Sequence, residues 1–130
     1  MTNSSKNKGD EGERECAALL NDLLGTTTIQ RALGAGRKED VGDIHGVAQV
    51  AVQVFRGKNW TTAINEKLPE VEQQRKNRRV RFASLWVRRL NSPIPWIVVM
   101  SPEQWAKMYK YAMIGVKAEV KRKRALEQED

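Results

Sequence analysis

The stretch from residue 49 to residue 55 constrains the fold more than any other part of this sequence. One side of its alternating pattern carries Val50, Val52 and Val54, and the other carries Gln49, Ala51, Gln53 and Phe55. Since side chains point to opposite faces of a strand at every second residue, the pattern predicts a strand with a valine face and a semi-polar face. Such a strand needs sheet neighbours and covering helices.

The flanking segments predict those neighbours. Asp10 and Glu13 form a capping-box-like start for a first helix that stops at Gly25, and Ser101 with Pro102 starts the last helix. Pro69 predicts a kink or a new helix inside the middle one. The expected ranges are a helix at 10–24, strands at 26–31, 41–45 and 49–55, a helix at 61–77, strands at 82–89 and 96–100, and a helix from 102 through 112 that can continue. This order favours an α/β fold with a mixed central β-sheet flanked by helices.

Cysteine content and charge exclude several classes of protein. Cys16 is the only cysteine in 130 residues, which excludes an intrachain disulfide and a zinc site built on paired thiols. The sequence lacks an apolar run suited to a signal peptide or a membrane span, so we expect a cytoplasmic protein without a membrane partner. Lysine and arginine outnumber aspartate and glutamate by 23 to 16, and the net charge of +7 favours a polyanionic partner.

The length fits one domain with two short extensions. Residues 1–8 are polar and charged after the first methionine, so we expect them to be disordered. Residues 9–112 are expected to form the α/β domain, and residues 113–130 a basic helical C-terminal tail. The Lys121 to Arg124 run in this tail is followed at once by acidic residues, so it suits either a phosphate-binding arm or a solvated tail.

Three side chains are candidates for a metal site. Glu13 lies on or beside the apolar stripe of the first helix, Asp43 follows a glycine where a strand begins, and Gln53 lies on the semi-polar strand face. Phosphodiester hydrolysis needs such oxygen atoms to converge on Mg²⁺. The alternative interpretations are a glutamate favoured by the helix dipole and an aspartate that belongs to a turn.

These residues also carry a resemblance to a known family. Lys8-Gly9 with Glu13, Gly42-Asp43-Ile44, Ala51-Val52-Gln53-Val54, the Glu72-Gln73-Gln74 helix and Trp96 to Met100 before a helix with Trp105 resemble the phage-encoded Holliday-junction-resolvase-like nucleases of the PD-(D/E)xK superfamily. The resemblance covers residues 8 to 112. It implies a restriction-endonuclease-like core, a homodimer, and Mg²⁺ or Mn²⁺ bound by Glu13, Asp43 and Gln53.

One position departs from the family pattern. Phe55 stands where the family has a lysine that helps to activate water, and a phenyl ring can neither hydrogen-bond water nor stabilise a developing charge. Lys58 is the candidate replacement if the strand ends or bulges nearby, whereas the alternative is a solvated loop lysine. Arg56 is expected to point to the opposite strand face. The candidate catalytic set is Glu13, Asp43, Gln53, Phe55 and Lys58.

Clustered basic residues are candidates for phosphate contacts, because guanidinium and ammonium groups bind the DNA backbone. The alternative is a solvated basic face that offsets the dipole of a helix C-terminus. The candidates are Arg37, Lys38, Arg75, Lys76, Arg78, Arg79, Arg81, Arg88 and Arg89.

Three functions are compatible with this sequence. The first is a metal-dependent, structure-selective endonuclease that hydrolyses branched or double-stranded DNA. The second is a catalytically silent DNA-binding protein that keeps the nuclease fold but has lost the water-activating lysine. The third is a scaffold that binds a host protein, with its charge serving solubility alone.

Overall fold

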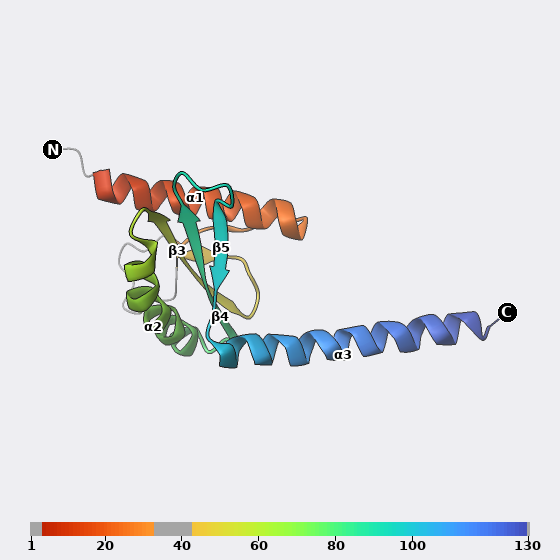
Figure 1. Ribbon diagram of the computed structural model, residues 1–130. Coiled ribbons are helices and arrows are strands. Elements are labelled where there is room, and N and C mark those ends of the chain that lie inside the picture. Colours follow the sequence, from red (N-terminus) through yellow and green to blue (C-terminus); the bar gives the residue numbers. More distant parts are fainter. Residues whose placement is uncertain (1–3, 33–42, 130) are drawn as a thin grey trace. The chain divides into compact units, whose positions relative to one another are not determined.

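The computed structural model describes residues 4–32 and 43–129. The elements follow one another in the predicted order of helix, three strands, helix, two strands and helix (Figure 1). Their bounds are α1 Ser4–Leu24, β1 Gln30–Arg31, β2 Ile44–His45, β3 Val50–Gly57, α2 Trp60–Arg78, β4 Phe82–Arg89, β5 Trp96–Val99 and α3 Pro102–Glu127. The predicted α/β class is therefore confirmed.

The central sheet is mixed, as the sequence predicts, and has the strand order β3-β4-β5. β3 and β4 run parallel, from Val50 beside Phe82 to Gly57 beside Arg89, whereas β5 pairs with β4 in the antiparallel direction. The strand arrows in Figure 1 show the same directions. α2 makes the connection that a parallel pair requires. β1 and β2 form a separate antiparallel pair.

The two faces of β3 pack against different helices. Val52 and Val54 belong to a buried cluster with Cys16, Ala17 and Leu20 of α1, to which Ile29 and Ile44 also contribute. Ala51, on the other face, packs with Val71 of α2 and with Ala83 of β4. The alternation that marks β3 in the sequence thus predicts correctly that its valines are core residues, although both faces are covered.

The first two strands are shorter than predicted because a helix side chain takes over part of their hydrogen bonding. The Asn21 side chain accepts from the Ile29 backbone N–H and donates to the Ile29 carbonyl, both at 2.9 Å. Thr26 also donates its hydroxyl to Asn21. These contacts satisfy the 26–29 backbone locally, so only Gln30 and Arg31 pair with β2. The predicted residues 41 and 42 lie outside the described residues.

Two helix boundaries differ from the sequence expectation. α1 begins at Ser4, so it includes residues that we expected to be disordered. α2 runs without interruption through Pro69, so no new helix starts there. Proline removes one N–H donor from a helix. At Pro69 the helix retains its other hydrogen bonds and its packing on the sheet, which together are enough to continue it.

The chain divides into two compact units, Met1–Met100 and Ser101–Asp130. The expected boundary after residue 112 stays a prediction. The predicted start signal is confirmed, because the Ser101 hydroxyl accepts from the Gln104 N–H at 3.2 Å and Pro102 follows it. None of the helices in the described part of the chain is long and apolar enough to cross a membrane.

Candidate functional site

Glu13 lies on α1 and is held by an arginine from β1. Arg31 Nε donates to Glu13 Oε2 at 2.9 Å, while Arg31 Nη2 contacts Asp10 Oδ1 at 2.6 Å. Both carboxylates are about three-quarters buried in this cluster, with exposed side-chain fractions of 26% for Asp10 and 20% for Glu13. One guanidinium therefore already offsets part of the negative charge that would otherwise attract a metal ion.

Asp43 is fixed where the chain enters β2, beside β3. Its N–H donates to the Val52 carbonyl at 2.9 Å and its carbonyl accepts from Ala32 at 2.8 Å. Its carboxylate Oδ2 accepts from the Val54 N–H at 2.9 Å. Burial, and secondarily the negative charge of Asp43, raise the pKa of the Cys16 thiol to about 12. The Asp43 carboxylate is thus close to α1 and acts locally as a cap for the β3 backbone.

Gln53 points from β3 toward α2. Its side chain is only 5% exposed, and its Nε2 donates to Glu70 Oε2 of α2 at 2.8 Å. The amide carbonyl oxygen of Gln53 is buried and accepts no hydrogen bond. An unsatisfied buried acceptor costs free energy comparable to a lost hydrogen bond. The Gln53 carbonyl oxygen is therefore a buried acceptor whose hydrogen-bonding capacity is unused.

The three predicted metal ligands have different hydrogen-bond partners in the structure. Glu13 belongs to the α1 side of the sheet with its Arg31 partner, whereas Gln53 belongs to the α2 side with Glu70. Asp43 touches the backbone of the residue that follows Gln53. Within residues 4–32 and 43–129, no three histidine, cysteine, aspartate or glutamate side chains gather to hold a metal ion.

Phe55 and Lys58, by contrast, line one pocket at the end of β3. The Phe55 ring packs against Gly57 so closely that a Cβ added there would lie 2.9 Å from the ring. Lys58 is exposed. The first turns of α2 complete the wall of the pocket with Asn59, Thr62, Ala63, Glu66 and Lys67. The phenyl ring thus makes an apolar surface where the family resemblance requires a cation.

Arg56 points to the opposite face, as predicted, and pairs with α1. Its guanidinium lies 3.2 Å from Glu15, which also contacts Arg88 of β4 at 3.2 Å. α1 can approach this closely because residue 12 is a glycine, whose added Cβ would lie 2.9 Å from the Arg56 Cβ. Glu15 therefore joins the ends of two neighbouring strands to the helix.

Most of the predicted DNA-binding arginines make contacts within the fold. Arg75 pairs with Glu72, and Arg78 donates to the Val50 carbonyl at 2.8 Å. Arg88 is held by Glu15, and the Arg89 guanidinium lies 5.4 Å from the Trp60 ring centre. Arg37 and Lys38 lie outside the described residues. The predicted residues with exposed side chains are Lys76, Arg79 and Arg81, which we call the α2–β4 corner.

Sequence reasoning missed two carboxylates, Glu15 and Glu70. Glu15 had an indirect signal, since Arg56 was expected on the valine face and needed an acidic partner from the covering helix. Glu70 lies one helical turn before the buried Gln74, which places it on the α2 face that meets the sheet.

Comparison of the chain with protein-family models, curated proteins and solved structures gives no match.

Proposed function

We propose that this protein binds the phosphate backbone of DNA and does not cut it. The observation that carries the proposal is the α2–β4 corner, where Lys76, Arg79 and Arg81 are exposed within six residues of chain. A net charge of +7 supports the same class of partner. DNA affinity then comes from cation–phosphate contacts and is sensitive to salt.

The backbone at the α2–β4 corner is well defined, which suits it to position cations. Arg79 adopts the left-handed conformation with φ 57° and ends α2, and its N–H bonds to the Arg75 and Lys76 carbonyls. Arg78, just before it, is anchored to the Val50 carbonyl of β3. The corner is therefore held by α2 and by the first residue of β3. Rigid backbone lowers the entropy lost when side chains contact a ligand.

The absence of cutting is inferred from the candidate centre. Glu13 and Gln53 have partners on opposite sides of the sheet, and Phe55 provides no proton acceptor or cation. Hydrolysis by a bound metal needs converging oxygens and an activated water, and these side chains supply neither together.

The test is fluorescence anisotropy with labelled duplex DNA and a labelled four-way junction over a salt series. The triple variant Lys76→Ala, Arg79→Gly and Arg81→Ala should weaken DNA binding at least about tenfold. It should also reduce, by about three, the magnitude of the slope of log binding constant against log salt concentration. Glycine is chosen at residue 79 because φ is positive there. Lys121→Ala, Arg122→Ala and Lys123→Ala remove the same charge from α3 and serve as the control. If both triple variants lose DNA affinity equally, or if the native chain shows no salt-dependent binding, the α2–β4 corner is not the DNA-binding site.

A second candidate is the Mg²⁺-dependent structure-selective endonuclease. It is favoured by the Gln53 carbonyl oxygen, which accepts no hydrogen bond, and by the Asp43 carboxylate, which contacts the N–H of Val54, the residue after Gln53. The discriminating assay incubates branched DNA with Mg²⁺ or Mn²⁺ and compares the native chain with Phe55→Lys and Asp43→Ala. If the native chain cuts the DNA and Asp43→Ala does not, the protein is a nuclease and the proposal of a catalytically silent DNA-binding protein is wrong. Cutting by Phe55→Lys alone would support the loss of a former activity.

A further inference from the structure

α3 exposes apolar side chains along most of its length. In the helix Pro102–Glu127 the only buried residue is Gln104. The exposed large apolar residues are Trp105, Met108, Tyr109, Tyr111, Ile114, Val116, Val120 and Leu126. A helix of this length with so little buried surface gains little from packing, and most helices in proteins depend on packing for their stability. Within its own unit, Ser101–Asp130, this helix therefore lacks the covering that its side chains would favour.

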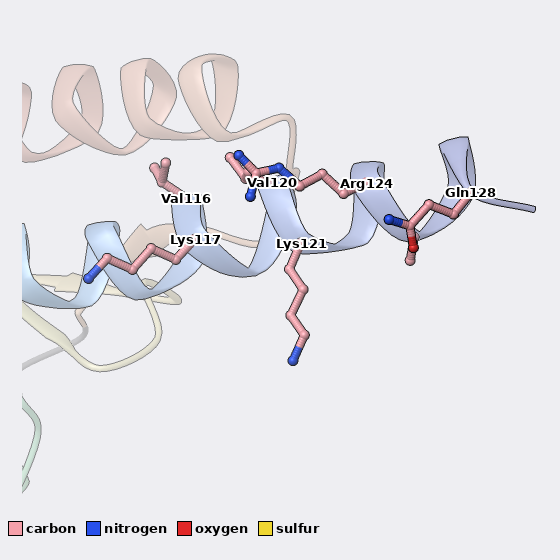
Figure 2. A pocket seen from close by; sticks show the side chains of 7 residues that line it. Val116, Lys117, Val120, Lys121, Arg124 and Gln128 are labelled. Atoms are coloured by element: carbon pink, nitrogen blue, oxygen red, sulfur yellow. The ribbon is translucent and has the colours of Figure 1, made fainter.

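The apolar side chains include a stripe with coiled-coil spacing. Ala106, Tyr109, Met113, Val116 and Val120 follow one another at steps of three, four, three and four residues. This alternation places them along one side of a helix, at the positions called a and d in a heptad. Figure 2 shows Val116 and Val120 on one side of α3 and Lys117 and Lys121 projecting elsewhere, around a shallow groove that also includes Arg124.

Charges beside this stripe favour one occupant and one orientation. Lys110, Lys117 and Arg124 lie along one edge of the stripe, and Glu119 lies on the other edge. In a parallel pair of α3 helices these edges meet, so Glu119 of one copy faces Arg124 of the second copy. In an antiparallel pair each edge meets itself, which would oppose three cations with three cations. We propose that α3 pairs in parallel with α3 of a second copy of this chain.

A second copy fits the stripe better than a polyanion does. The charged phosphates of the DNA backbone are poor partners for Val116 and Val120, whereas an identical helix covers them with the same apolar side chains. The lysines on the far side of α3 remain available to solvent in the pair. The stripe ends at Lys123 and Glu127, so the paired segment is short and the dimer depends on protein concentration. This inference is independent of DNA binding.

The first experiment measures the mass of the full chain by sedimentation equilibrium over a concentration series. The native chain should shift from the mass of one copy to that of two. The double variant Val116→Asp with Val120→Asp should raise the dissociation constant at least about tenfold, which corresponds to about 1.4 kcal/mol. Ile114→Asp is the matched control, because Ile114 is 64% exposed and lies outside the stripe on the same helix. Circular dichroism confirms that each variant remains helical.

The second experiment tests the orientation by oxidation. In a parallel pair residue 116 faces its own counterpart, so Val116→Cys should form a disulfide-linked dimer, and Ile114→Cys should not. Cys16 is buried and is replaced by alanine in both variants. A native chain that remains monomeric, or a dimer that survives both aspartates, overturns the proposal. Loss of DNA or anionic-vesicle binding in the aspartate variant without any change in mass also overturns it.

Discussion

The two faces of β3 differ in chemistry although they belong to the same strand. The α1 face is covered by a cluster of seven buried residues, including the fully buried Cys16 and Ile44. The α2 face has a smaller cluster and holds the buried amides of Gln53 and Gln74. Apolar burial on the first face stabilises the fold, whereas the second face contains polar groups that stabilise it poorly. The difference separates a face whose burial is mainly apolar from a face that also buries side-chain amides.

The largest expected effect comes from the α1 face. Ile44→Ala removes a side chain with no exposed surface and should lower the free energy of unfolding by about 3 kcal/mol, through lost burial and a cavity. Chemical denaturation measures the change. Ile94→Ala is the control, because Ile94 is 61% exposed and should change stability by less than about 0.5 kcal/mol. Equal losses at both positions would contradict this account of the core.

The second prediction concerns the stability of the same α1 face at alkaline pH. The pKa of Cys16 is raised in the folded protein from its ordinary value of 9.0 to about 12, mainly by burial. A raised pKa means that the thiol contribution is complete below pH 9 and is lost as the pH rises toward 12. The slope is about 1.4 kcal/mol per pH unit in that window. Between pH 9 and 12 the free energy of unfolding should therefore fall less steeply with pH in Cys16→Ala than in the native chain. Identical slopes would show that the Cys16 thiol does not cause the pH dependence.

A smaller effect is expected at the rim of the α1 face. Glu15→Gln leaves Arg56 and Arg88 without their shared carboxylate and should cost about 1 kcal/mol, less at high salt. Glu119→Gln removes the exposed pair with Lys123 on α3 and should cost less than about 0.5 kcal/mol. Thermal unfolding at two salt concentrations compares the variants. A larger loss for Glu119→Gln would reverse this ranking.

The smallest effect is expected on the α2 face. Gln53→Leu replaces a buried amide whose carbonyl oxygen has no donor, so stability should stay within about 1 kcal/mol of the native value or increase. Gln53→Ala is the matched comparison, because it leaves a cavity and should be less stable than Gln53→Leu. A loss of several kcal/mol in Gln53→Leu would mean that the hydrogen bond to Glu70 stabilises the fold after all.

The order of elements was predictable because period and start signals are local. The alternation in β3 and the Ser101-Pro102 start of α3 depend only on neighbouring residues, and both are confirmed. The lengths of β1 and β2 were not predictable, because Asn21 of α1 takes hydrogen bonds that a longer strand would use. A new helix at Pro69 was a wrong prediction for a related reason, since the packing of α2 outweighs one lost hydrogen bond, whereas the alternative prediction of a kink is not tested.

The candidate site was less predictable than the fold. Placing Gln53 and Phe55 on one strand face and Arg56 on the other follows from alternation, and the Glu15 contact confirms it for Arg56. Placing Glu13 and Gln53 on opposite sides of the sheet required knowing which face each helix covers, and no local pattern contains that information. The partners Arg31 and Glu70 come from distant segments, so their competition for the candidate ligands emerges only from the tertiary structure.

The parallel pairing of β3 with β4 has a consequence during synthesis. β3 can pair with β4 only after residues 82–89 have been synthesised. One edge of the valine-rich strand β3 is therefore open while α2, which connects the two strands, is still emerging from the ribosome. Open edges of this kind invite association between nascent chains. Arg56 and Lys58 place positive charge where the apolar run of β3 ends, and charged residues at such positions generally discourage aggregation.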